Sequence, residues 1–347
     1  MKIKLITSIL LLILLPLVLA QEVDYNSAYS WLTTNPANNM NPTEASLTAM
    51  VLSQTGINPS PYIQRLIDLK NPNDACWPTS CDVSHTAFVL LAMNGGIQIN
   101  NVNKQDVVKW IENDQNKAKL DGQWNLQIVT EDTDDCNLLY TKQGQTTQNS
   151  PIRLEVNEGS IKGGSCTQSS TFFDIGRCIP DTLTSASTNL NIDCRQLSNA
   201  RISLVYKESN SYYLISESSS ESANIIIKNG CFGLGTSCDE HSTYYTDWAL
   251  KQNSEINSIL YLKKLLSSNS NPVLYHSSLY LITNNDLYIT LLEDTKGIGK
   301  QYYGSSPNLW NNAFAYLALK QAGRETEELK SWFASQQNTQ DNWNNDI

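Results

Sequence analysis

The sequence is short of histidine and of charged side chains. Its 347 residues include three histidines, and Asp, Glu, Lys and Arg together make up 17% of the chain. There are 24 basic residues against 34 acidic ones, which gives a formal net charge of −10. Because an acidic surface repels phosphate groups, we expect no nucleic-acid partner.

Patterns that mark several kinds of active site are also missing. No C-x-x-C pair occurs, and the histidines are not spaced as zinc-finger ligands. There is no glycine-rich phosphate loop and no G-x-S-x-G nucleophile turn. The residues form no evident catalytic set, and we expect neither a cofactor nor a metal ion.

The chain begins like an exported protein. Two lysines precede an apolar run over residues 5–20, which closes on Val18-Leu19-Ala20. This pattern is typical of a signal peptide cleaved after Ala20, and we assign residues 1–20 to it. An uncleaved membrane anchor is the alternative, but the run is short for a bilayer span and contains Pro16. We expect a secreted or cell-surface protein without a transmembrane segment after cleavage.

The cysteines support export. All eight follow the predicted cleavage point, and an even number in an exported chain favours disulfides over a zinc site. The short intervening loops predict the bridges Cys76–Cys81 and Cys231–Cys238. The remaining four are expected to pair among themselves, with three connectivities open: Cys136, Cys166, Cys178 and Cys194.

Two segments of the chain repeat each other. Residues 79–93 align without a gap with residues 236–250; both begin Thr-Ser-Cys-Asp and carry Thr four positions after the Asp. Asp82 and Asp239 are expected to cap the first turns of equivalent helices, because an Asp oxygen accepts the free N–H groups there. An aromatic residue follows the upstream cysteine in both copies, Trp77 in one and Phe232 in the other.

Weaker copies extend the repeat. Apolar helices are expected to end before Gly56, Gly96 and Gly323, since glycine terminates helices readily. The expected second helices of these hairpins cover residues 61–69, 104–116 and 325–336, and further helices cover 255–266 and 273–283. Turns with a tryptophan near residues 73–77, 121–124 and 336–343 are expected to introduce hairpins, with each indole filling the gap between neighbours.

Hairpins separated by Q…D-G-x-W turns, with inner helices of D-x-x-x-T-A-x-x-L-x-A-L type, resemble the terpenoid cyclase/protein prenyltransferase α/α-toroid superfamily. The resemblance covers residues 25–125 and 231–347. It implies a ring of helical hairpins, a fold shared by terpene cyclases, prenyltransferase β-subunits and complement-type thioester domains. The fold alone does not define an activity.

Between the helical parts, the helical period gives way to strand-like runs rich in Ile, Val and Tyr over residues 125–230. We expect an inserted antiparallel β-sandwich there, between toroid parts at 21–124 and 231–347, and hence an α+β multidomain protein. Predicted strands cover 125–130, 152–156, 172–175, 190–193, 202–206, 212–216 and 224–227, with hairpin tips at 209–211 and 218–220. The chain ends where another inner helix is expected; either the C-terminus is naturally ragged or, as we favour, the sequence is a fragment and the second toroid part is truncated.

The few candidates for chemistry have plain structural alternatives. Asp132-Thr133-Asp134-Asp135 spells D-x-D-D, which resembles the protonating motif of class II terpene cyclases, but acidic clusters at such a place are usually solvated turns. Asp82 with His85 and Asp239 with His241 would suit a metal or acid–base site, but we favour the interpretation that they are caps and partly exposed helix starts. A prenyltransferase-like zinc site is disfavoured because nearby cysteines are expected in disulfides. The run N-G-C-F-G at Cys231 lacks the G-C-G-E-Q pattern of a thioester. His276 has no nearby motif.

We therefore expect a binding or scaffold protein at the cell exterior, whose partner is a protein, a glycan or a lipid. The alternative is an enzyme that uses the toroid centre, of the terpene-cyclase or polysaccharide-lyase type. A third possibility is a structural component of the cell envelope. A binding module predicts an exposed apolar or aromatic patch on the insert, whereas an enzyme predicts a deep pocket with carboxylates or histidine at its floor.

Overall fold

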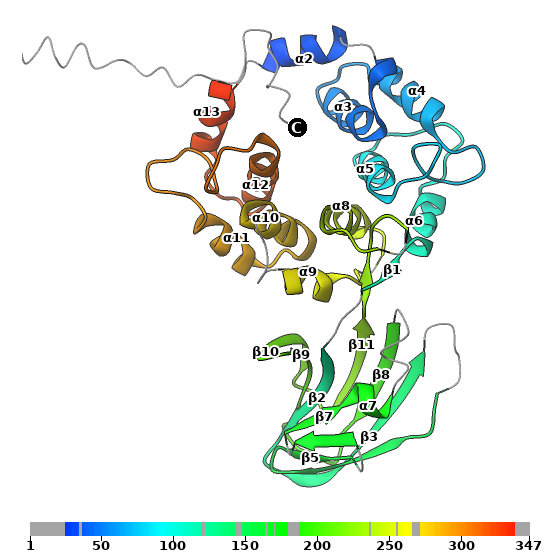
Figure 1. The fold of residues 1–347 in the computed structure, drawn as a ribbon, viewed down its shortest axis with the longest axis vertical. Coiled ribbons are helices and arrows are strands. Elements are labelled where there is room, and N and C mark those ends of the chain that lie inside the picture. Colours follow the sequence, from blue (N-terminus) through cyan, green and yellow to red (C-terminus); the bar gives the residue numbers. More distant parts are fainter. Residues whose placement is uncertain are drawn as a thin grey trace, which may run out of the picture. The chain divides into compact units, whose positions relative to one another are not determined.

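The computed structural model describes residues 25–34, 37–118, 122–142, 148–163, 166–169, 171–179, 187–235, 237–254, 256–265 and 271–336. The fold is mixed α+β, with antiparallel sheets inserted between helices (Figure 1). Two compact units are formed, one by Met1–Asp68 with Asn269–Ile347 and the other by Leu69–Ser268. The predicted signal peptide and the tryptophan turn near residue 343 lie outside the described residues. In the described part of the chain, no helix is both long and apolar enough to cross a membrane.

In the second unit, the two aligned copies form helices α5 (Val83–Asn94) and α8 (Glu240–Leu250). Ser84 Oγ in the first turn of α5 lies 2.9 Å from Ser242 Oγ in the first turn of α8. At the other end, the Asn94 side chain donates to the carbonyl of Ala249 at 2.9 Å. The N-terminal ends of the two helices contact each other, and so do their C-terminal ends, so the two helices run parallel. Helices α6 (Lys104–Asn113) and α9 (Ile259–Leu265) follow them in the chain.

The first unit contains a second parallel pair, α10 (Pro272–Thr283) and α12 (Leu309–Gln321). Asn311 donates to the side chain of Asn271 at 3.0 Å near the helix starts, and Gln321 donates to that of Asn284 at 2.7 Å near their ends. The remaining elements of this unit are α2 (Tyr25–Thr34), the 3₁₀ turn η1 (Ala37–Asn39), α3 (Pro42–Gln54), α4 (Ser60–Leu69), α11 (Asp286–Glu293) and α13 (Glu327–Gln336).

The helix ends match the turn chemistry of the sequence. Gly56, Gly96 and Gly323 have φ values of 75°, 98° and 68°, the left-handed conformation that stops a helix at little steric cost. Helix α9 begins at Ile259, later than predicted, and Ser258 just before it donates a hydrogen bond to Asp247 of α8. Helices α2 and α11 are additional to the sequence prediction.

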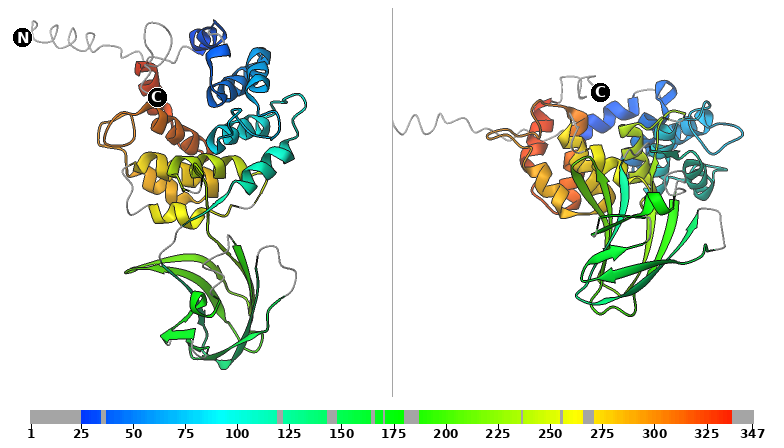
Figure 2. Two further views of the ribbon diagram at one scale, coloured as in Figure 1. Left: turned by 45° about the vertical axis from the view of Figure 1, so that its right-hand side comes forward. Right: turned by 60° about the horizontal axis from the view of Figure 1, so that its bottom comes forward.

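The insert consists of two five-stranded antiparallel sheets with the strand orders β10-β9-β2-β7-β6 and β11-β8-β3-β4-β5. Figure 2 shows these strands, mostly in green, from two further sides. The strands are β2 (Gln123–Val129), β3 (Thr133–Lys142), β4 (Ile152–Asn157), β5 (Ser160–Lys162), β6 (Thr167–Ser169), β7 (Phe172–Asp174), β8 (Ser187–Asp193), β9 (Arg201–Glu208), β10 (Ser211–Ser218) and β11 (Ser222–Lys228). The short helix α7 (Ile175–Cys178) follows β7.

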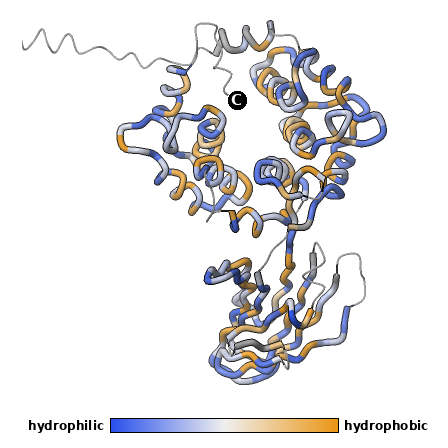
Figure 3. The backbone as a smooth tube through the Cα atoms, viewed as in Figure 1, coloured by the Kyte–Doolittle hydropathy of each residue, from blue (hydrophilic) through white to orange (hydrophobic). Residues whose placement is uncertain are grey.

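One apolar core is shared by both sheets of the insert. Leu126 and Leu204 come from one sheet, and Leu138 and Leu190 come from the other. Hydrophobic and hydrophilic residues alternate along several strands (Figure 3), as a sheet with one buried face requires. The core also contains Trp124, which packs edge-on against Tyr206 at 5.2 Å.

Three expectations about the insert were wrong in detail. Trp124 was expected to fill a gap between helical hairpins, but it lies in the core of the insert. Residues 218–220 were expected to form a hairpin tip; instead they connect β10 to β11, which belong to different sheets. Strand β3 was missed because its acidic start resembles a turn, yet it pairs with both β4 and β8.

A two-stranded ribbon joins the insert to the helices. Its strands, β1 (Asn116–Lys117) and β12 (Gly230–Cys231), pair antiparallel and bring the two ends of the insert together. Helix α9 adds two contacts: Leu260 joins the core of the insert, and Lys264 Nζ lies 2.6 Å from a carboxylate oxygen of Glu208 on β9.

Candidate functional site

The acidic residues at the starts of α5 and α8 are helix caps. Asp82 Oδ1 accepts the backbone N–H of His85 at 2.9 Å and lies 2.8 Å from the ring Nδ1 of the same histidine. Burial raises the pKa of Asp82, but the hydrogen bonds from the His85 side chain and backbone outweigh burial, so the net pKa is lowered. Asp239 Oδ1 accepts both the N–H and the hydroxyl of Ser242 at 2.7 Å.

A second contact recurs behind each cap. The hydroxyl of Thr86 accepts the backbone N–H of Trp77 at 2.9 Å and donates to a carbonyl of its own turn. In the other copy, Thr243 holds the N–H of Phe232 in the same way at 3.0 Å. Each threonine thus fastens a buried aromatic residue to the first turn of the helix. We call this contact the threonine clip.

A third copy of this contact uses different residues. At the start of α12, Asn308 is the cap, and the side chain of Asn312, four positions later, accepts the N–H of Tyr303 at 2.8 Å and donates to its carbonyl at 3.2 Å. The buried aromatic residue and the four-residue spacing are kept, while asparagine replaces threonine. Sequence comparison missed this copy because neither the clip residue nor the aromatic one is identical.

The three candidate histidines differ in their surroundings. His85 is half-buried beside its cap, whereas His241 is exposed and its ring lies 6.2 Å from that of Tyr245. His276 is buried on α10, in the other unit, and burial lowers its pKa. The roles observed for Asp82, Asp239 and His85 are those of helix starts.

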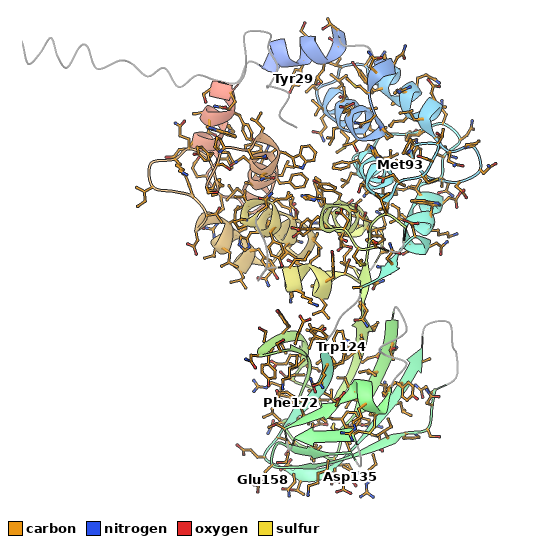
Figure 4. The ribbon with its side chains drawn as sticks, in the orientation of Figure 1. Tyr29, Met93, Trp124, Asp135, Glu158 and Phe172 are labelled. Carbon is orange, nitrogen blue, oxygen red and sulfur yellow. A yellow bond between two sulfur atoms is a disulfide. The ribbon has the colours of Figure 1, made fainter. Side chains whose placement is uncertain are left out.

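Asp135, the last residue of the D-x-D-D run, lies at the end of the insert remote from Trp124 (Figure 4). Asp134 and Asp135 belong to strand β3 instead of the expected turn. Asp135 pairs with Arg153, whose Nε lies 2.7 Å away. Asp132 accepts hydrogen bonds from the hydroxyl and the backbone N–H of Ser198, which lower its pKa. A lowered pKa is the opposite of what a protonating acid requires.

All eight cysteines are paired. Cys76 bonds to Cys81 and Cys231 to Cys238, as the loop lengths predict. In the insert, Cys136 on β3 bonds to Cys194 after β8, and Cys166 bonds to Cys178, which resolves the open connectivity. Among the described residues, one cluster has the composition of a metal site, namely Asp74 with Cys76 and Cys81, but its two sulfurs are joined to each other.

One fully buried carboxyl group stands apart from these structural roles. Asp247 lies near the C-terminal end of α8 and has no exposed surface. Its Oδ1 lies 2.6 Å from the hydroxyl of Ser258, and its Oδ2 is also within hydrogen-bonding distance of that hydroxyl. Burial raises its pKa to about 7, partly offset by the hydrogen bond from Ser258.

Asp247 faces a cavity of about 310 Å³. Its walls carry six side chains with oxygen acceptors, which are Glu112, Asn113, Gln115, Asp247, Ser254 and Asn257. Phe232 and Leu250 supply apolar wall. The cavity lies beside the ribbon that carries the insert: the Asn257 carbonyl accepts the N–H of Gly230 on β12 at 3.0 Å, and its side chain donates to Gln115 at 3.3 Å.

A second candidate surface is the edge strand β10. It pairs with β9 along one side, and no other described strand pairs with it. Tyr212 and Leu214 on its outer face are 54% and 53% exposed. The ring of Tyr212 stacks on that of Phe172 at 5.9 Å, with Lys207 Nζ 5.3 Å from its centroid.

Sequence reasoning did not single out Asp247 or β10. The signal for Asp247 is present in the aligned copies: eight positions after the cap, α5 has Leu90, which is fully buried, and α8 has an aspartate. A charged residue at a position that is apolar in the other copy of a repeat indicates that it is not there for apolar packing. Comparison with protein-family models, with curated proteins and with solved structures finds no match for this chain.

Proposed function

We propose that the chain is an exported binding protein in which helical hairpins of the α/α-toroid type carry the two-sheet insert, and that it recognises a protein partner outside the cell through the edge strand β10. The four disulfides fit an oxidising exterior.

The helices support the toroid part of this proposal. In an α/α toroid, neighbouring inner helices run parallel because each hairpin returns the chain to the same side. Each unit contains one such parallel pair, α5 with α8 and α10 with α12. The recurring cap and buried aromatic residue at the starts of α5, α8 and α12 are consistent with one repeating hairpin.

The observation that carries the binding proposal is the exposed apolar edge of β10. An unpaired strand edge offers N–H and C=O groups to an extended segment of another chain, and flanking side chains supply specificity. Tyr212 and Leu214 lie together on the outer face of this edge strand at more than half exposure, and the stacking with Phe172 holds the Tyr212 ring in place. Such edges are usually protected by charge or proline in proteins that do not use them.

The test is a binding measurement on the surface of cells that express the gene. Labelled protein with native disulfides is compared with the double variant Tyr212→Lys/Leu214→Lys and with Ile226→Lys, a matched control on the edge strand β11. We expect the double variant to lose at least about tenfold in affinity, equivalent to about 1.4 kcal/mol, and the control to bind as the original does.

Unchanged binding of the double variant would refute the role of β10. Binding to a glycan array that survives the double substitution would place recognition elsewhere and identify the partner as a carbohydrate. Circular dichroism of each variant separates a lost contact from a lost fold.

A further inference from the structure

The cavity at Asp247 has the chemistry of a cation site. Two of its wall residues, Glu112 from α6 and Asp247 from α8, are acidic, and no basic side chain lines it. The amides of Gln115 and Asn257 add carbonyl oxygens. Phe232 presents an aromatic ring, which attracts a cation through its electron-rich face and also packs against hydrocarbon. A volume of about 310 Å³ is at the lower end of the range for small-molecule sites.

The hydrogen bonding of Asp247 is incomplete in a way that a ligand would correct. Both carboxyl oxygens approach the Ser258 hydroxyl, which has a single hydrogen to donate. This hydrogen bonds to one carboxyl oxygen or is shared by both, so Ser258 leaves acceptor capacity on Asp247 unfilled. Nearby, the Ser254 Oγ is buried at the cavity wall and has no hydrogen-bond partner among the described residues. Buried polar atoms without partners are uncommon because they are costly.

The repeat shows that the carboxyl group is not required to build the helix pair. Leu90 occupies the equivalent position in α5 and is fully buried. The α8 copy keeps the cap and the threonine clip but replaces this apolar residue by Asp247 at the wall of a cavity.

We propose that this cavity binds a small organic cation, a primary ammonium on a short hydrocarbon body, with the ammonium paired to Asp247 and the body against Phe232 and Leu250. The ammonium donates the hydrogens that the carboxylate oxygens lack. On binding, the carboxyl proton is released to solvent, so that a negative carboxylate is paired with the positive ammonium in the buried site. Glu112 is the other titratable group on the wall. The site is separate from β10, and it stands or falls independently of the proposed function.

Isothermal titration calorimetry on the full chain tests this proposal with n-pentylamine, its neutral counterpart 1-pentanol, and calcium chloride. We expect pentylamine to bind and pentanol not to. At pH 6, measurements in two buffers of different ionisation enthalpy should show the release of close to one proton per ligand, and the affinity should weaken as the pH falls further.

Two variants complete the test. Asp247→Asn, which replaces the acid by a neutral group of the same shape, should weaken pentylamine binding at least about tenfold and abolish the proton release. Asp106→Asn, on the same helix as Glu112 but outside the cavity, should leave both unchanged. Equal binding of pentylamine and pentanol, binding of calcium without the amine, or pentylamine binding that survives Asp247→Asn in a folded protein would each overturn the proposal.

Discussion

Helices α5 and α8 begin alike and then diverge. Both have an Asp cap, a threonine clip and a buried aromatic residue held by the clip. Eight positions after the cap, one has Leu90 and the other Asp247, and both side chains are fully buried. The comparison separates what the hairpin needs in order to form from what one copy has added. The start of the helix is common architecture, and the buried carboxyl group is specific to α8.

The two positions differ in their surroundings. Leu90 is held in an apolar helix in which Val89 and Leu91 are also buried. Asp247 has a hydroxyl partner in Ser258 and a cavity on one side. A carboxyl group can be buried at position 247 because it has a hydrogen-bonding partner in Ser258 and a raised pKa that favours its neutral form. No observed contact at Leu90 offers such a hydrogen-bonding partner.

The largest effect is expected from Leu90→Asp, which imposes the α8 residue on α5. It removes apolar packing and buries a carboxyl group without the hydroxyl partner, so the free energy of unfolding should fall by at least about 5 kcal/mol. Urea denaturation at pH 7 measures this loss, with Leu90→Met as the volume-conserving control. A loss below about 2 kcal/mol would mean that the two positions are equivalent after all.

Next in size is the pH dependence caused by Asp247. Its pKa is raised to about 7 in the folded protein, against about 3.9 in an unfolded chain. The folded state therefore holds more protons between these values, and stability should decrease by roughly 4 kcal/mol in total as the pH rises from below about 4 to above about 7. Asp247→Asn should lack this decrease and be the more stable protein at pH 8.

The pH dependence of stability caused by Asp82 has the opposite sign. Its folded pKa is lowered, so its stabilising contribution is present above an unfolded pKa of about 3.9 and is lost as the pH falls through the folded value. Thermal unfolding of Asp82→Asn and Asp247→Asn across pH 3–8 distinguishes the two. Parallel pH profiles for the two variants would contradict the assignment.

The smallest expected effect comes from the threonine clip, which α5 and α8 share. Thr86→Val and Thr243→Val keep the shape of the side chain but leave the N–H groups of Trp77 and Phe232 without their acceptor. Each should cost about 1–3 kcal/mol of unfolding free energy, by similar amounts. Thr55→Val is the control, since its hydroxyl bonds only to carbonyls of its own helix. A difference of more than about 1 kcal/mol between the two substitutions would argue against a common hairpin start.

The features that the sequence predicted well are those with local physical causes. Asp82 and Asp239 precede apolar helices, and Gly56, Gly96 and Gly323 follow them, so caps and ends could be located from short-range chemistry. The cysteine pairs in short loops are of the same kind.

The features that were missed depend on contacts distant in the sequence. Strand β3 begins with acidic residues and is a strand because β4 and β8 pair with it. Ser258, whose hydroxyl gives the buried Asp247 a hydrogen-bonding partner, lies beyond the end of α8. Asn312 replaces a threonine in the third copy by supplying equivalent hydrogen bonds from a different side chain. The strand pairings and the Ser258 contact have no fixed spacing that a pattern could detect, whereas the Asn312 contact keeps its spacing from the cap and changes the residue type.

The hydrogen bond between Ser84 and Ser242 joins residues 158 positions apart. At synthesis rates of about 5–20 residues per second, roughly 10–30 seconds separate their emergence from the ribosome. During that interval α5 exists without its parallel neighbour, while the insert, whose ends are joined by the β1–β12 ribbon, is made in between. Helix α8 can therefore pair with α5 only after the whole insert has been translated.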